Sequence, residues 1–194
     1  MSYWKQMWGK ISDTVTRAVR IDSATHAMET IEYEHHEIHG GSHYFVVGYA
    51  DLANAHVLDF QWTIPDTTKW IHWTWQIDTE SGLLWQVYEG AVITNPLAAA
   101  ITPRNSDRNS ANTSSTTMRY EDQANLAAAN ADTNVGGATL IESGISGAGK
   151  DAGNAIRSHE IILKQNTVYC LRATANAAGY INFSMQWYEH TNKG

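Results

Sequence analysis

The sequence predicts a mostly β fold, an antiparallel β-sandwich or jelly roll preceded by an extended or short-helical N-terminal arm. Three observations support this fold class. Apolar and polar residues alternate over short runs, turn-forming residues separate the runs, and no long helical pattern comes between them. Roughly nine or ten short strands in this pattern favour a sandwich or barrel over alternating strand–helix units. The jelly roll is the eight-stranded solution, and it recurs in viral capsid proteins.

The clearest predicted strand covers residues 69–78. Its period of two is that of a strand with one face buried. The predicted strand 180–188 repeats the pattern. The residues predicted to point inward from these two strands are Ile71, Trp73, Trp75, Ile77, Ile181, Phe183, Met185 and Trp187. Large aromatic side chains bury much area in a core, so Trp73, Trp75 and Trp85 are predicted core residues.

The other predicted strands follow from the same alternation and from flanking turn residues. They cover residues 28–37, 43–50, 57–63, 83–93, 113–120, 138–143, 158–164 and 167–175. Residues 94–112 form a long connection. Residues 121–137, rich in Ala, Asn and Asp, fit a surface loop or a short helix.

We divide the chain into an N-terminal arm, residues 1–25, and a single β-sandwich domain, residues 26–194. The arm has apolar residues at helical spacing, which indicates a short amphipathic helix, although Gly9 weakens this prediction. The arm either docks on a partner or packs on its own domain. For the first case, the candidate partner-binding residues are Trp4, Met7 and Trp8.

Composition excludes several classes of function. The 43% apolar residues support a packed core, and the net charge of −7 disfavours direct binding of nucleic acid. The sequence contains no run of 18 apolar residues, so no transmembrane helix is expected. The N-terminus lacks a continuous apolar segment, so no signal peptide is predicted. The single cysteine, Cys170, lies in an apolar run and is predicted to be a buried structural thiol.

A histidine cluster is the first candidate for metal chemistry. Residues 34–43 contain His35, His36, His39 and His43, and imidazoles are ligands for zinc, iron and nickel. Metal-binding jelly rolls of the cupin type use different spacings, and on a strand His35 and His36 would face opposite sides. We therefore predict structural or interface histidines that tune assembly near pH 6, with no metal and no cofactor. A cupin-like metal enzyme is the alternative.

A glycine-rich run, residues 144–151, matches the phosphate-binding pattern GxxxxGK. Asp151 stands where that pattern needs Ser or Thr for Mg²⁺, and its charge would repel phosphates. The prediction is a flexible loop between two strands. Since no GxSxG motif occurs either, we assign no catalytic residues and expect that the chain is not an enzyme.

Several strings resemble a widespread family of tailed-phage structural proteins. They lie at residues 30–33, 35–43, 104–110, 161–169, 180–182 and 187–190. The resemblance covers about residues 20–190. It implies a virion component rather than an enzyme, assembled in the host cytoplasm and located on the phage capsid.

Within a virion, the resemblance implies a capsid decoration or cement subunit. Such a subunit would bind the major capsid protein or other virion proteins, as a homotrimer, and stabilise the shell. The alternative is a receptor- or carbohydrate-binding module of a head fibre or tail, which would present exposed tryptophans on one face of a sheet.

Overall fold

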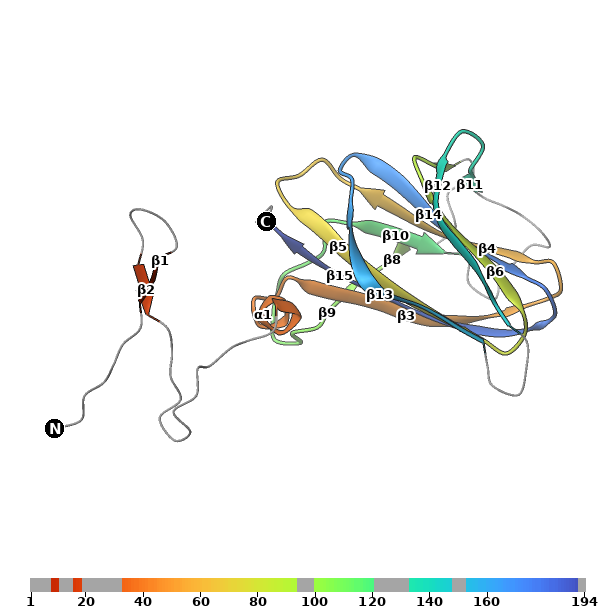
Figure 1. Ribbon diagram of the computed structural model, residues 1–194, viewed down its shortest axis with the longest axis horizontal. Helices are drawn as coiled ribbons and strands as arrows, with labels where there is room; N and C mark the ends of the chain where they lie inside the picture. Colours follow the sequence, from red (N-terminus) through yellow and green to blue (C-terminus); the bar gives the residue numbers. More distant parts are fainter. Residues whose placement is uncertain are drawn as a thin grey trace. The chain divides into compact units, whose positions relative to one another are not determined.

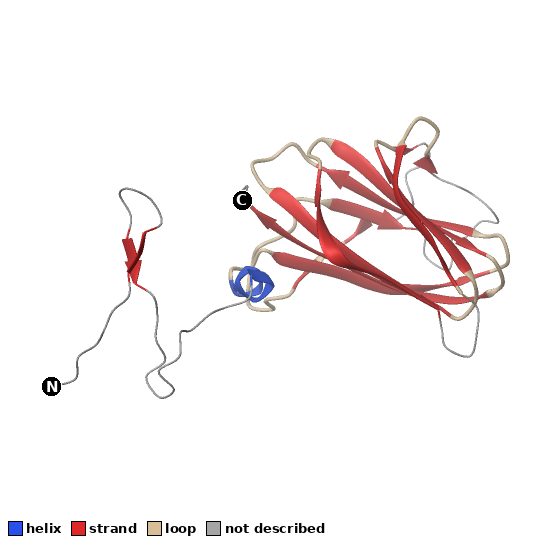
Figure 2. Ribbon diagram, viewed as in Figure 1, coloured by secondary structure: helices blue, strands red, loops and turns tan. Residues whose placement is uncertain are grey.

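The computed structural model describes residues 8–10, 16–18, 33–93, 100–120, 133–147 and 153–191. The chain divides into two compact units, residues 1–36 and residues 37–194. Each unit is considered by itself below. The larger unit is almost entirely β-structure (Figure 2), which confirms the predicted fold class.

Eight long strands of the larger unit pair as one rolled-up hairpin. The first four strands pair with the last four in reverse order: β3 with β15, β4 with β14, β5 with β13 and β6 with β12. These strands are β3 (His43–Leu52), β4 (Val57–Ile64), β5 (Trp70–Thr79), β6 (Leu83–Glu89), β12 (Thr139–Ser146), β13 (Gly153–Leu163), β14 (Thr167–Ala175) and β15 (Gly179–His190).

Rolling this hairpin produces two antiparallel sheets, which pack face to face (Figure 1). The six-stranded sheet has the order β12-β6-β14-β4-β10-β8, and the five-stranded sheet has the order β13-β5-β15-β3-β9. The long strands therefore have the jelly-roll arrangement. The connection between β6 and β12 supplies the short strands β7 (Val92–Ile93), β8 (Ala100–Ile101), β9 (Arg104–Asn105) and β10 (Thr117–Tyr120), and also β11 (Thr133–Asn134), which pairs with β7.

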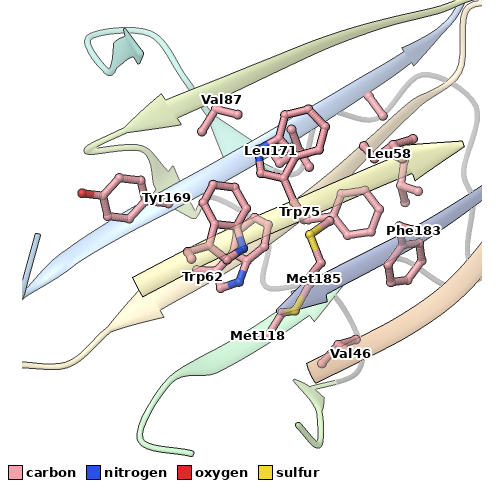
Figure 3. Close-up of a cluster of buried hydrophobic side chains, with 14 of the residues drawn as sticks. Val46, Leu58, Trp62, Trp75, Val87, Met118, Tyr169, Leu171, Phe183 and Met185 are labelled. Atoms are coloured by element: carbon pink, nitrogen blue, oxygen red, sulfur yellow. The ribbon is translucent and has the colours of Figure 1, made fainter. Parts of the chain in front are cut away.

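The core fills the space between the two sheets and is rich in aromatic side chains (Figure 3). Trp62 and Trp73 come from opposite sheets, with ring centroids 4.8 Å apart in an edge-to-face contact. Trp75 and Trp85 make the same kind of contact at 4.7 Å. Such pairs are the preferred geometry of neighbouring rings. The predicted core positions of Trp73 and Trp75 are confirmed, and Trp85 packs half-buried against the core.

Cys170 is fully buried, as predicted. It lies on β14, with Gln61 of β4 and Tyr88 of β6 as its cross-strand neighbours. The next pair on this outer face, Asp59 and Arg172, forms a two-pronged ion pair at 2.8 and 2.9 Å. Because Arg172 and Asp59 belong to neighbouring strands, this ion pair joins β14 and β4 across the sheet.

In the N-terminal arm, the described residues form a small hairpin of two strands, β1 (Trp8–Lys10) and β2 (Thr16–Ala18). The helical prediction is wrong for these residues, and the extended alternative holds. Gly9 disfavours a helix and Thr16 favours a strand, and the cross-strand pairing outweighed the helical spacing of the apolar residues. Trp4 and Met7 lie outside the described residues. Trp8 begins β1.

The prediction of a strand over residues 28–37 is also wrong for residues 33–37, which the structure describes. They belong to the helix α1 (Tyr33–His39). Residues 28–32 lie outside the described part. The helix ends in a glycine motif: the amide of Gly41 donates to Ile38 O and that of Ser42 donates to Glu37 O, both at 3.0 Å. Gly41 has φ +67°, a conformation that glycine adopts without strain. Within the described residues, no helix has the length and hydropathy of a membrane span.

Two other glycines change the predicted ends of strands. Gly90, with φ +77°, interrupts the predicted strand 83–93 after β6. Gly144 belongs to β12, which continues to Ser146 beyond the predicted end at residue 143. A Cβ at Gly144 would overlap the ring of Trp85. The glycine-rich run therefore begins as a strand that makes room for an aromatic ring, and its residues 148–151 lie outside the described part.

Candidate functional site

Polar residues from distant parts of the sequence meet at one end of the five-stranded sheet. We call this region the polar corner and define it as residues 37–43, 104–116 and 187–190. Figure 1 shows β9 and the end of β15 at this end of the sandwich. The corner contains much of the sequence strings 35–43, 104–110 and 187–190.

Glu189 is the central residue of the polar corner. Its side chain is 1% exposed, and its carboxylate accepts hydrogen bonds from Ser114 Oγ at 2.6 Å and Ser115 Oγ at 2.7 Å. The amide of Ser115 and Trp187 Nε1 also donate to it, at 3.1 and 3.2 Å. Burial of a carboxyl group is tolerated when hydrogen-bond donors satisfy its oxygens in this way. Glu189 therefore attaches the 114–116 segment to β15.

A second set of contacts holds the same connection against the end of α1. The side-chain amides of Asn105 and Asn112 both donate to Gly41 O, at 2.9 and 3.0 Å. A Cβ on Gly41 would overlap Ser110. The corner thus depends on a glycine at position 41 both for its backbone conformation and for space.

His43 and Ser106 form a close pair in the polar corner. His43 Nδ1 lies 2.6 Å from Ser106 Oγ, and the Ser106 amide donates to His43 O at 2.9 Å. A hydroxyl and an imidazole at this distance resemble a nucleophile and its base. However, His43 is 4% exposed. We interpret the pair as a structural contact that holds the 104–110 segment against β3.

The structure divides the predicted histidine cluster. His35, His36 and His39 are exposed residues of α1, whereas His43 is buried on β3. Three exposed helical histidines and one buried strand histidine do not reproduce the inward-facing ligand set that a cupin builds on its strands. Among the residues that the structure describes, no three His, Cys, Asp or Glu side chains form a group that could hold a metal ion.

A different pair of histidines, which the sequence did not indicate, meets on the outer face of the five-stranded sheet. His72 Nε2 of β5 lies 2.9 Å from His190 Nε2 of β15. His72 Nδ1 lies 3.1 Å from Glu160 Oε1 of β13. Tyr188 donates its hydroxyl to the other oxygen of Glu160, and its ring stacks on His72 at 4.6 Å.

Electrostatics in this group follow from burial and from its hydrogen bonds. Burial alone would raise the pKa of Glu160, but hydrogen bonds from Tyr188 and His72 outweigh it, so this pKa is lowered. Burial lowers the pKa of His190, and His72 lowers it further, against the opposing charges of Glu37 and Glu160. The arrangement therefore favours an ionised Glu160 beside a neutral His190.

Sequence reasoning missed this group because its members are far apart in the chain. The alternation in residues 69–78 does place His72 on the outer face, but only the strand order brings His190 and Glu160 to it. Glu160 also depends on an irregularity in β13. Residues 158–160 lie between the partners of Trp75 and Trp73, opposite Thr74 alone. Bulges of this kind redirect side chains and are frequent near functional sites.

Exposed apolar side chains gather on β12, which lies at one edge of the six-stranded sheet, with β8 at the other edge. Ile145 is 74% exposed, and Leu140 and Ile141 are also exposed. On the five-stranded sheet, Val47 and Tyr49 of β3 are exposed as well. Exposed apolar side chains are therefore present on both sheets, and those of β12 lie at a sheet edge.

The fold therefore defines the chain as a jelly-roll β-sandwich with a polar corner at one end. In comparisons with known proteins, no family model, no curated protein and no solved structure matched this chain.

Proposed function

We propose that the chain is a non-enzymatic structural subunit of a tailed-phage virion that decorates the capsid and stabilises it. Its partners are the major capsid protein or other virion proteins, and its own assembly state is a homotrimer. The strings quoted above support the phage assignment, and the jelly-roll strand order is one that capsid proteins use repeatedly.

The observation that carries the proposal is the character of β12. Proteins usually protect a sheet edge with charges, proline, bulges or a short strand, because a free edge pairs with other chains. β12 is eight residues long, its only charged residue is Glu142, and it exposes Leu140, Ile141 and Ile145. Although β12 has a register irregularity between Leu140 and Glu142, the strand remains suited to burial against a neighbouring subunit.

The mechanism needs binding energy alone. Burying apolar surface stabilises a contact by about 25 cal/mol per Å². A decoration subunit that touches several shell subunits links them, and repetition over the lattice multiplies the effect. The polar corner contributes rigidity, since its hydrogen bonds fix the long connection between β6 and β12 to the rest of the sandwich.

Cryo-electron microscopy of purified virions tests the proposal. We expect many copies of the chain on the shell lattice, grouped as trimers. Ile145→Lys should lower the number of bound copies, whereas Val47→Lys, at a residue that is 61% exposed on another strand, should leave it unchanged. Absence of the chain from the particle would contradict the virion assignment. Equal binding of the two variants would contradict the role of β12.

One observation favours carbohydrate binding as a second candidate function. Tyr49 and Tyr180 are 59% and 48% exposed, and both belong to the outer face of the five-stranded sheet. Asn182, exposed on the same face, is the cross-strand neighbour of Tyr49. Exposed rings beside amide groups are suited to stacking on sugars and bonding their hydroxyls. Tryptophans were expected to bind the sugar. Four of them are buried and therefore cannot stack on a ligand: Trp62, Trp73, Trp75 and Trp187.

A glycan array probed with the full chain distinguishes this candidate from decoration. Binding that is lost in Tyr49→Ala and kept in Ile145→Lys would support a receptor-binding module. No binding to any glycan would leave capsid decoration as the function to pursue.

A further inference from the structure

The pair formed by His72 and His190 has the geometry of two ligands to one ion. His72 and His190 are diagonal neighbours on adjacent strands, because His72 pairs with Tyr188 and His190 pairs with Trp70. Their Nε2 atoms face each other at 2.9 Å. Two metal–nitrogen bonds of about 2.0–2.1 Å would place the two nitrogens about 2.9 Å apart at the right angle of a square-planar or octahedral ion, and about 3.3 Å apart at the angle of a tetrahedral ion such as zinc.

One of the two histidines is already oriented for this role. The carboxylate of Glu160 can only accept a hydrogen bond, so its contact at 3.1 Å assigns the proton to His72 Nδ1. This tautomer leaves the lone pair of the His72 ring on Nε2, the atom that faces His190. A ligand histidine commonly donates its second nitrogen to a carboxylate in this way.

Further contacts hold the carboxylate and the ring in place. The hydroxyl of Tyr188 donates to the second oxygen of Glu160. The ring of Tyr188 stacks on His72 with an interplanar angle of 18°. His72 is 10% exposed, Glu160 is 46% exposed and His190 is partly exposed, so the group lies on the outer surface of the sheet.

We propose that His72 and His190 form a binding site for a divalent transition-metal ion of the zinc, nickel or copper class, with Glu160 as the residue that positions His72. Imidazole nitrogen suits these ions. On binding, the ring proton of His190 moves from Nε2 to Nδ1 through solvent, so both Nε2 lone pairs face the ion and no net proton is released.

The remaining coordination positions belong to water or to a partner subunit. No third His, Cys, Asp or Glu joins the pair within the described ranges. A site with two protein ligands exchanges its ion readily. The inference depends on the side chains of three strands and is independent of the proposed function.

Titration of the full chain with zinc tests the proposal, after removal of metal with a chelator. His35 and His39 of α1 are four residues apart, a spacing that places two imidazoles on one face of a helix. The titration therefore uses a background in which both are replaced by glutamine. We expect one zinc ion per chain, measured by calorimetry. The same background with Cu²⁺ should give an electron paramagnetic resonance spectrum with nitrogen ligands.

Substitutions then identify the ligands. Replacing an outer-shell partner of a metal ligand costs about 10–100-fold in affinity. We expect a loss of that size for Glu160→Gln and a larger one for His72→Gln and His190→Gln. His56→Gln is the control, since His56 lies in the turn between β3 and β4, and it should change nothing. Circular dichroism verifies that each variant is folded.

Two results would overturn the proposal. One is an absence of stoichiometric zinc binding in the His35→Gln, His39→Gln background. The other is binding that is equally strong in the folded His190→Gln variant.

Discussion

Glu189 shows how one residue stabilises a connection that has little regular structure. Its carboxylate is buried and accepts hydrogen bonds from Ser114, Ser115 and Trp187. Removing an acceptor from a buried network leaves its donors without partners, which costs more than one ordinary hydrogen bond contributes. The polar corner should therefore be sensitive to small changes at this position.

Glu189→Gln should lower the free energy of unfolding by about 1–3 kcal/mol, because the new amide group brings donors to a place where donors already converge. Denaturation with urea measures this change. Asp66→Asn, at an exposed carboxylate, is the control and should stay within about 0.5 kcal/mol of the parent chain. A variant as stable as this control would contradict the central role of Glu189.

Tyr44 predicts how stability changes in alkaline solution. Burial, followed by the negative charge of Glu189, raises the pKa of Tyr44 to about 12 from its usual value of 10. The folded state keeps the hydroxyl proton longer than the unfolded state does. This contribution to stability is complete below pH 10 and is lost as the pH rises from 10 towards 12.

Tyr44→Phe should therefore lose less of its unfolding free energy than the parent chain between pH 8 and pH 11. Denaturation with urea at the two pH values checks this expectation. Tyr169, whose pKa is also raised, by burial and by its hydrogen bond to Glu89, remains in both chains. If both chains lose the same free energy, Tyr44 does not contribute to the pH dependence.

At the scale of elements, β12 depends on contact between Gly144 and Trp85. Gly144→Ala should destabilise the sandwich by about 1–3 kcal/mol, because the new methyl group would overlap the indole ring and displace it. Gly147→Ala is the matched control. A Cβ there meets no atom within 4 Å, so its stability should equal or slightly exceed that of the parent chain. Thermal unfolding of both variants measures the difference in stability. Equal melting temperatures would contradict the inference that Gly144 makes room for the ring of Trp85.

Elements with one buried face were predictable from sequence, since the alternation of residues records which side faces the core. β5 and β15 illustrate this, with predicted inward residues such as Trp73 and Phe183 buried. The helix α1 was not predicted, because its run of Glu and His has no clear apolar face. Its signal was the pair Gly40 and Gly41, which ends the helix.

The candidate sites were predictable only in part. The strings at residues 35–43, 104–110 and 187–190 contain residues of the polar corner, but they were singled out for a resemblance and predicted no site there. Their contacts, such as Asn105 with Gly41, arise from the fold of a long connection that has no periodic pattern. The pair His72 and His190 depends on strand order and on the irregularity of β13. Neither can be deduced from alternation along a single strand.

At the scale of the whole molecule, the N-terminal arm and the sandwich are predicted to have separate roles. Residues 37–194 form a compact unit of their own, so deletion of residues 1–20 should leave its melting temperature unchanged. The same deletion should lower the number of copies bound to the capsid, because the arm is a candidate partner-binding segment. Quantitative gel analysis of purified virions measures the bound copies.

A full-length variant with Trp4, Met7 and Trp8 replaced by serine separates side-chain contacts from chain length. It should reproduce the loss of binding caused by the deletion. Undiminished binding of both variants would contradict the role of the arm.

The rolled hairpin also sets a condition on synthesis. β15 is the last of the eight long strands to leave the ribosome, yet it occupies the middle of its sheet, between β5 and β3. Until it emerges, those two strands have no neighbour between them, and their apolar faces are open to other nascent chains. Pairings between distant segments also form slowly. A cell that makes this protein in quantity therefore holds a population of nearly finished chains that need protection from aggregation. The yield of folded protein should depend on the supply of chaperones, even if the finished fold is stable.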